Sequence, residues 1–157
     1  MKLSSNYEIR LASERDARQI AEMSRNLIEV GLGWSWTAKR VVKSVRDKDA
    51  NVAVAHNAGR VIGFGIAKYK VDEAHIVLLA VNKASRRKGV GTALMKWIEK
   101  TALIAGIGVI YLEARLNNTS ARKFYQALGY KEFKTEPGRY KGIESGIRLG
   151  KDLWSEE

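Results

Sequence analysis

The spacing of apolar residues along the chain predicts alternating strands and helices. Residues 7–11 alternate between polar and apolar, which indicates a first strand. From residue 17 to residue 30 the apolar positions follow helical spacing, so a first helix is expected to end at Gly31 or Gly33. Thr37 is suited to cap the first turn of a second helix, whose apolar positions are spaced in the same way.

The rest of the chain is predicted to continue this alternation. Residues 74–81 are nearly all apolar, which is typical of a strand in the centre of a sheet. We expect strands over 51–56, 61–69, 74–81, 109–114, 130–135 and 143–149, helices over 93–105 and 121–128, and a loop at Pro137-Gly138. This order predicts one α/β domain of the α+β type over residues 1–157, with its core in residues 7–149.

The composition is that of a globular protein. Hydrophobic residues make up 45% of the 157 residues and charged residues 29%, which fits a single domain with a sizeable core. No apolar run reaches the roughly 18 residues of a membrane span, and residues 1–6 lack the apolar core of a signal peptide. We therefore expect a cytoplasmic protein that does not associate with membranes. The chain has no cysteine and only His56 and His75, so thiolate catalysis is excluded and no metal is expected.

The net charge of +11 suggests a polyanionic partner, either a nucleic acid or a phosphorylated cofactor. The lysines and arginines are scattered over the whole chain instead of forming one block. This distribution favours a solvated basic surface together with a phosphate-bearing cofactor over nucleic-acid binding.

A basic, glycine-spaced loop stands between the central predicted strand and the helix that follows it. Its residues are Arg86, Arg87, Lys88, Gly89, Val90, Gly91 and Thr92. Such a loop offers free backbone N–H groups, the positive end of a helix dipole and cationic side chains, and its glycines let a ligand approach closely. We therefore expect a site for a diphosphate. The spacing fits neither a Walker loop nor a dinucleotide fingerprint, which would need a third glycine at Leu94.

Two sequence blocks resemble the signatures of one enzyme family. Arg86-x-x-Gly89-x-Gly91 resembles the R/Q-x-x-G-x-G/A signature of the GNAT acetyl-CoA-dependent N-acetyltransferases. Asn118-x-x-Ala121-x-x-Phe124-Tyr125-x-x-Leu128-Gly129-Tyr130 is similar to that family's N-x-x-A-x-x-F/L-Y-x-x-x-G-F pattern. The resemblance implies a single GNAT-like domain with a mixed, largely antiparallel, twisted sheet of about seven strands, flanked by about four helices and splayed between strands 4 and 5. It also implies acetyl-CoA as the cosubstrate.

A narrower resemblance concerns the ribosomal-protein alanine N-acetyltransferases, which acetylate a protein N-terminal amine. It depends on Trp36-Thr37, Asp72-Glu73-Ala74-His75 and Leu112-Glu113-Ala114-Arg115. The chain departs from this subgroup at Asn82-Lys83, at Lys141, which stands after Tyr140 where a second tyrosine is usual, and in a short loop over 137–145. The resemblance implies a protein N-terminus as the acceptor. Because the departures lie where the acceptor would bind, a small amine such as a polyamine stays open.

The family resemblance assigns chemical roles to several residues. It implies Glu113 as the general base, Tyr125 as the general acid that protonates the departing thiolate, and Asn118 as a contact to the cofactor arm. It further implies that Leu79, Ala80 and Val81 hold the acetyl carbonyl and the pantetheine arm, and that backbone amides from Arg87 to Thr92 hold the pyrophosphate.

The residues themselves leave other roles open. Glu113 ends an apolar strand, where burial would raise the pKa of its carboxyl toward a value useful for a base. It could instead pair with Arg115 or with a neighbouring lysine. A water relay could then be the base. Tyr125 could be a core tyrosine, and Asn118 could cap a helix as well as contact the cofactor. His75 is interpreted as a structural histidine.

Trp34, Trp36 and Tyr140 are the candidate residues for substrate binding. The two tryptophans stand in a glycine-containing loop between helices, where they either wall the substrate cleft or pack the helix ends. Acidic residues of the first strand–helix unit could attract a cationic acceptor: Glu8, Glu14, Asp16, Glu22 and Glu29.

The predicted function is transfer of an acetyl group from acetyl-CoA to a primary amine. Because the chain has no cysteine, a cysteine-linked acyl-enzyme is impossible, which favours direct attack in a ternary complex. The expected partner is the amine acceptor, and the protein is expected to be a monomer or a homodimer. A non-catalytic acetyl-CoA sensor and a ribosome- or RNA-binding module are the alternatives from other functional classes.

Overall fold

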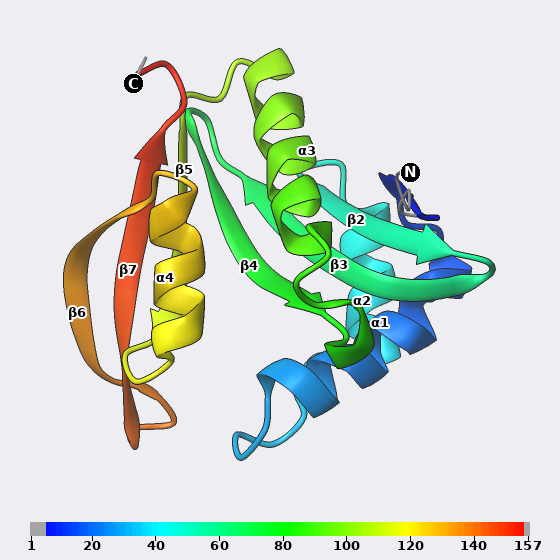
Figure 1. Ribbon diagram of the computed structural model, residues 1–157, viewed down its shortest axis with the longest axis horizontal. Coiled ribbons are helices and arrows are strands. Elements are labelled where there is room, and N and C mark those ends of the chain that lie inside the picture. The colour runs from blue at the N-terminus through cyan, green and yellow to red at the C-terminus, as the bar shows by residue number, and fades with distance from the viewer. Residues whose placement is uncertain (1–5, 156–157) are drawn as a thin grey trace.

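Seven strands form one sheet in the computed structural model, which describes residues 6–155 (Figure 1). The strand order across the sheet is β1-β2-β3-β4-β5-β7-β6. Neighbouring strands are antiparallel except for β4 and β5, which are parallel. The strands are β1 (Glu8–Leu11), β2 (Ala50–Asn57), β3 (Arg60–Tyr69), β4 (Glu73–Val81), β5 (Val109–Arg115), β6 (Lys131–Tyr140) and β7 (Glu144–Asp152). The mixed, largely antiparallel sheet expected from the sequence is therefore confirmed.

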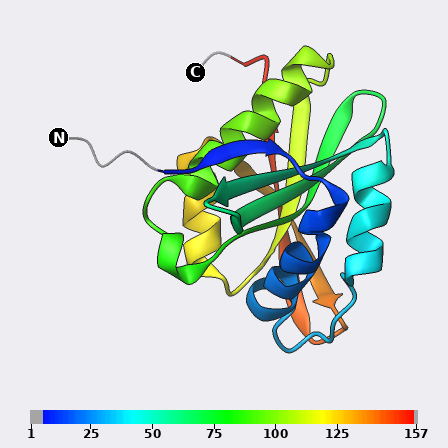
Figure 2. The same ribbon diagram turned by 90° about the vertical axis from the view of Figure 1, so that its right-hand side faces the viewer.

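Across residues 6–155, four α-helices cover the two faces of the sheet. In Figure 2, α1 and α2 lie on one face, and α3 and α4 lie on the other. The α-helices are α1 (Ala17–Met23), α2 (Ala38–Arg46), α3 (Val90–Ile104) and α4 (Thr119–Ala127), and the shorter helical turns are η1 (Glu14–Asp16), η2 (Ser24–Ile28) and η3 (Lys83–Ser85). Within residues 6–155, no helix is long and apolar enough to cross a membrane.

Each face of the sheet carries a layer of apolar side chains. The layer beneath α3 and α4 includes the buried residues Ile76, Met95, Ile98, Ile110 and Leu149. The layer beneath α1 and α2 includes the buried residues Ile20, Val41, Val54, Phe64 and Ile66. Removal of these side chains from water stabilises the position of each helix on the sheet. The helices in turn fix the loops that begin and end them.

The first helix differs from its prediction, because its last turns are wider than an α-helix. α1 ends at Met23, and η2 continues it as a π-helical turn, in which the Glu29 N–H donates to the Ser24 carbonyl at 2.8 Å. Ser24 is buried, and its hydroxyl donates to the Glu29 carboxylate at 2.8 Å. The spacing of apolar residues does not reveal this turn, since it depends on a polar contact inside the fold. Turns of this type are frequent at functional sites.

The hairpin formed by β6 and β7 also departs from its prediction. The sequence predicts a loop at Pro137-Gly138, but β6 continues through both residues to Tyr140. The register with β7 shifts between Glu136 and Tyr140, which places the proline in an irregular part of the strand. Proline has no N–H to give to the strand ladder, and it is tolerated there because the irregular pairing does not require one.

The sheet splits where β4 and β5 separate. These strands pair from Glu73 and Val109 only as far as Ile76 and Leu112, and then diverge, as Figure 1 shows. On its other edge β4 stays paired with β3, with a bulge that leaves Val77 without a partner. The splay between strands 4 and 5 expected from the family resemblance is therefore confirmed. The edge of β4 beyond the split faces a gap instead of a neighbouring strand.

Candidate active site

A cleft of about 980 Å³ occupies the gap between the separated strands. Its walls come from β4, the end of β5, the start of α3, α4 and the segment 27–32 after α1. Of the residues predicted for the site, only Lys88, Trp34 and Trp36 do not line it. The fold therefore brings most of the predicted residues together.

The N-terminus of α3 forms one end of the cleft. Its first backbone hydrogen bond runs from the Ala93 N–H to the Gly89 carbonyl at 2.9 Å, so the N–H groups of Val90, Gly91 and Thr92 precede the helical ladder. A Cβ on Gly91 would lie 3.2 Å from the Phe124 ring, so a larger residue there would crowd α4. This end of the cleft can hold an anion through backbone N–H groups and the helix dipole.

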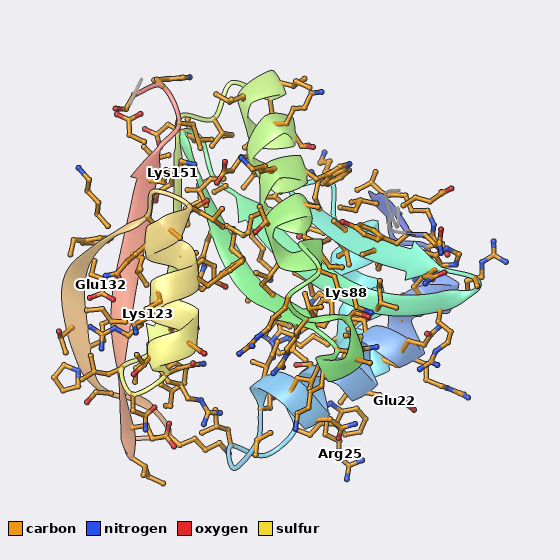
Figure 3. All side chains as sticks on the ribbon, in the orientation of Figure 1. Glu22, Arg25, Lys88, Lys123, Glu132 and Lys151 are labelled. Atoms are coloured by element: carbon orange, nitrogen blue, oxygen red, sulfur yellow. The ribbon has the colours of Figure 1, made fainter. Side chains whose placement is uncertain are left out.

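Two arginines add positive charge at the same end. Arg86 and Arg87 line the cleft, and the Arg86 Nε donates to the Val81 carbonyl at 3.0 Å. Lys88 is exposed and does not line the cleft; Figure 3 shows it at the turn before α3. The backbone turns sharply on both sides of Lys88, with φ of 63° at Arg87 and 81° at Gly89.

The helix α4 places Asn118, its N-cap, and Tyr125, in its last turn, on the opposite wall. The Asn118 side chain caps the helix by accepting from the Ala121 N–H at 3.1 Å, and it also lines the cleft. The Tyr125 ring is 8% exposed and packs edge-on against Phe124 and Tyr130. Within residues 6–155 its hydroxyl has no hydrogen-bond partner. Burial raises the pKa of Tyr125, so this hydroxyl keeps its proton at physiological pH.

Glu113 lies in a group of charged side chains. Its carboxylate is 2.6 Å from His75 Nε2, 3.0 Å from Arg148 Nη2 and 3.4 Å from Arg139 Nη2. Burial by itself raises the pKa of Glu113, but His75, Arg139 and Arg148 outweigh it and lower that pKa below its usual range. Burial therefore acts as the sequence predicts, but the expected net rise in the pKa of Glu113 is wrong because its charged neighbours reverse it. His75, interpreted from the sequence as a structural histidine, is a direct partner of Glu113.

Sequence reasoning missed the charged partners of Glu113 on β6 and β7. Arg139 and Arg148 also pair with Glu136, at 3.5 and 3.2 Å. A signal was present, because Arg148 stands between the apolar residues Ile147 and Leu149 and so faces the opposite side of the sheet. The pairing itself depends on strands that are distant in the sequence.

The tryptophans predicted for substrate binding lie outside the cleft. Trp36 is 5% exposed and packs in the layer beneath α1 and α2, with the Arg40 guanidinium 3.9 Å from its ring centre. The Trp34 Nε1 donates to the Ala21 carbonyl at 3.2 Å. Both side chains lie at the helix ends and do not line the cleft, because their loop folds back onto α1 and α2. Tyr140 does line the cleft.

The acidic residues of the first strand–helix unit also lie outside the cleft. Asp16 pairs with Arg10 at 2.9 Å, and Glu14 pairs with Arg46 at 2.7 Å. Glu29 is buried among hydrogen-bond donors. The charged residues that do line the cleft are Arg86, Arg87, Glu113 and Arg115. The cleft therefore contains three cations and one carboxylate.

The sequence profile of the acetyltransferase (GNAT) family matches residues 7–130. The chain belongs to this family. The family resemblance drawn from the two sequence blocks is therefore confirmed.

Three GNAT-family relatives are similar to most of this chain. An N-alpha-acetyltransferase of Sulfurisphaera tokodaii is 30% identical over 146 residues, which cover 85% of each chain. The [ribosomal protein bS18]-alanine N-acetyltransferase of Escherichia coli is 28% identical over 97 residues, which cover 62% of this chain and 65% of that enzyme. The chain is also similar to Ard1 from Thermoplasma volcanium, whose crystal structure matches it with a TM-score of 0.84. The two sequences are 25% identical, and the match covers 96% of this chain and 100% of that one.

These relatives include the ribosomal-protein subgroup expected from the narrower resemblance. The chain spans 62% to 65% of the length of several of the curated relatives that it matches, including the Escherichia coli enzyme. Within residues 6–155 of this GNAT domain, no three histidine, aspartate or glutamate side chains are grouped so that they could hold a metal ion.

Glu29 holds the loop that follows the first helix of the GNAT domain. Its carboxylate accepts hydrogen bonds from the Ser24 hydroxyl at 2.8 Å, from the N–H and hydroxyl of Ser35 at 2.7 Å each, and from the Trp36 N–H at 3.2 Å. Burial by itself raises the pKa of Glu29, but these donors outweigh it and lower that pKa. The carboxylate is therefore held as an anion, and its hydrogen bonds to Ser35 and Trp36 hold the two ends of the loop together.

Replacing Glu29 with glutamine is expected to lower the free energy of unfolding at pH 7 by roughly 2–3 kcal/mol, because a charged acceptor of several hydrogen bonds is lost. Since the folded pKa is lowered, this stabilisation is present above the unfolded value of about 4.3 and is lost as the pH falls through the folded value. Urea unfolding at pH 7 and at successively lower pH measures the difference. Glu22→Gln, on the exposed side of α1 (Figure 3), is the control and should change little.

Proposed function

We propose that this protein transfers the acetyl group of acetyl-CoA to the N-terminal amine of a protein. The observation that carries the proposal is the cleft between β4 and β5, which joins an anion-binding helix end to Tyr125 and Glu113. A ligand with a diphosphate at one end and a reactive acyl group at the other fits this arrangement. Membership of the GNAT family supports the same reaction class.

The donor half of the cleft accounts for acetyl-CoA binding. The N–H groups of Val90, Gly91 and Thr92, with the charges of Arg86 and Arg87, bind the diphosphate in this proposal. Beyond Ile76, β4 presents peptide groups to the cleft instead of to β5, and these bind the pantetheine arm and the acetyl carbonyl. The Asn118 side chain contacts the arm from the other wall.

The chemistry requires a neutral amine and a protonated leaving group. The amine nitrogen attacks the thioester carbonyl carbon, the C–S bond breaks, and the new amide nitrogen loses a proton. Glu113, held as an anion by its cationic neighbours, receives that proton directly or through a water molecule. The Tyr125 hydroxyl donates its proton to the departing thiolate and regains one from solvent.

The charge of the cleft supports a peptide acceptor over a polyamine. A polyamine or another polycation would need several carboxylates, whereas the cleft has Glu113 alone, and that carboxylate is already paired with two arginines. The segment 27–32 presents apolar side chains that suit an uncharged peptide. The named activities of the relatives from Sulfurisphaera tokodaii and Escherichia coli support the same acceptor class.

The proposal is tested by thiol release from acetyl-CoA with a panel of acceptors. The panel contains peptides with free N-termini, the same peptides with blocked N-termini and an internal lysine, and polyamines. Release with the free N-termini alone is the expected result. Release with polyamines alone would assign the small-amine function instead. Acetyl-CoA binding without turnover on any acceptor would assign a sensor.

Replacing Glu113 with glutamine is expected to lower kcat/KM for the acceptor by about 100-fold. Since the pKa of Glu113 is lowered, the wild-type carboxylate is ionised from pH 6 to pH 9, and the loss should be the same at every pH in that range. Steady-state kinetics at several pH values measures it. Glu136→Gln is the matched control, because Glu136 pairs with the same two arginines but does not line the cleft. An equal loss in both variants would mean that the ion pairs, and not a base, are responsible.

A further inference from the structure

Arg115 makes polar contacts with both sides of the cleft. Its Nη2 donates to the Ile28 carbonyl at 2.8 Å and to the Val30 carbonyl at 3.0 Å. Its Nη1 is 3.3 Å from the Glu144 carboxylate, and its guanidinium lies 5.7 Å from the centre of the Tyr140 ring. One side chain at the end of β5 therefore contacts the segment after α1 and the facing ends of β6 and β7.

The bonds to Ile28 and Val30 cross the gap where the sheet is split. β4 and β5 pair only as far as Ile76 and Leu112, so no strand ladder connects the two halves beyond that point. The His75–Glu113 contact, at 2.6 Å, lies at the point of the split, and farther toward the open end Arg115 donates hydrogen bonds from β5 to the segment after α1. Arg115 therefore holds the segment after α1 to the end of β5.

The segment that Arg115 holds is a wall of the cleft. Leu27, Ile28, Val30 and Leu32 line it. The guanidinium stands at the C-terminal end of the helical run formed by α1 and η2, where the carbonyl groups carry partial negative charge and favour a cation. The Arg115 side chain is 22% exposed, so water competes only partly for these bonds.

We propose that Arg115 is a positioning residue that sets the separation between the apolar acceptor wall, residues 27–32, and the strand that carries Glu113. It touches neither the acetyl group nor the attacking amine. It fixes the wall against which the acceptor lies, so that the amine reaches Glu113 in one place. This role rests on the acetyl transfer proposed above, and it concerns acceptor binding, not acetyl-CoA binding.

Replacing Arg115 with glutamine is expected to raise the KM for the peptide acceptor by about tenfold or more, since the two carbonyl bonds are lost. The dissociation constant for acetyl-CoA should stay within about twofold, because the α3 end of the cleft is untouched. Arg115→Lys keeps the charge and a donor but cannot span both carbonyls, so it should restore part of the acceptor affinity.

Arg122→Gln is the matched control. Arg122 donates to the Leu116 carbonyl at 2.8 Å and pairs with Glu132 at 2.7 Å, so it loses the same kinds of bond. It touches neither Ile28 nor Val30. Amide hydrogen exchange over residues 24–32 gives a measurement that does not depend on turnover, and it should become faster in Arg115→Gln and stay unchanged in Arg122→Gln.

Two results would overturn the role of Arg115. One is an acceptor KM that rises equally in Arg115→Gln and Arg122→Gln, and the other is unchanged exchange over residues 24–32 in Arg115→Gln. Failure of the proposed function is a different result, in which the wild-type protein transfers acetyl groups to no amine. In that case the exchange measurement still decides whether Arg115 holds the wall.

Discussion

Replacing Gly89 with glutamate is expected to weaken acetyl-CoA binding by about 100-fold or more, which corresponds to ~2.7 kcal/mol. Gly89 precedes the first turn of α3 with a φ of 81°, and nothing lies within 4 Å of the place where a Cβ would stand. The side chain therefore has room, but its negative charge would lie beside the N–H groups assigned to the diphosphate. It would repel the ligand and occupy the positive end of the helix dipole. Isothermal titration with acetyl-CoA measures the loss.

Gly59→Glu separates this effect from backbone strain. Gly59 has a φ of 84° and also has nothing within 4 Å of a Cβ, but it lies in the turn between β2 and β3, away from the cleft. Both variants should lose about 1 kcal/mol of stability from the left-handed backbone. Only the variant at Gly89 should lose acetyl-CoA affinity. If Gly89→Glu leaves the affinity for acetyl-CoA unchanged, the diphosphate does not bind at this end of the cleft.

Replacing Tyr125 with phenylalanine is expected to lower kcat by about 100-fold and to leave the acetyl-CoA dissociation constant within about twofold. The substitution removes one oxygen and keeps the ring that packs against Phe124 and Tyr130. Because burial raises the pKa of Tyr125, the hydroxyl is protonated throughout the assay range and can donate to the thiolate. Single-turnover kinetics separates this step from product release.

Tyr130→Phe is the control for the loss of a buried hydroxyl. The Tyr130 hydroxyl donates to the Glu99 carboxylate at 2.8 Å, and Tyr130 does not line the cleft. This variant should lose roughly 1–3 kcal/mol of stability, because a hydrogen bond to a charged group is removed, and should keep its kcat. If Tyr125→Phe turns over like the wild-type protein, another group protonates the thiolate.

Several local features of the fold could be predicted because they depend on neighbours in the chain. Thr37 caps α2 by accepting from the Arg40 N–H at 3.3 Å, and Asn118 caps α4 in the same way. The strand-to-helix loop at residues 86–92 stands where the sequence placed it, at the start of α3. Caps, glycine positions and apolar spacing involve contacts within a few residues, so the sequence carries them directly.

Other features depend on segments that are distant in the chain. The partners of Glu113 come from β4, β6 and β7, and together they reverse the change in its pKa that burial alone would cause. The sequence predicts a loop at Trp36. In the structure the Trp36 side chain is buried beneath α2, because that loop folds back. The identity of one residue in the sequence does not specify which charged or apolar side chains lie next to it across a sheet.

The sequence by itself determined the order of strands and helices, the glycine-spaced loop before α3 and the family, because these follow from local periodicity and two ordered blocks. Only the tertiary structure decided which side chains share the cleft. The split after Ile76 and Leu112 opens the sheet, and the bonds from Arg115 to Ile28 and Val30 reach across it. The sequence does not reveal these contacts, since they join residues far apart in the chain that only packing brings together.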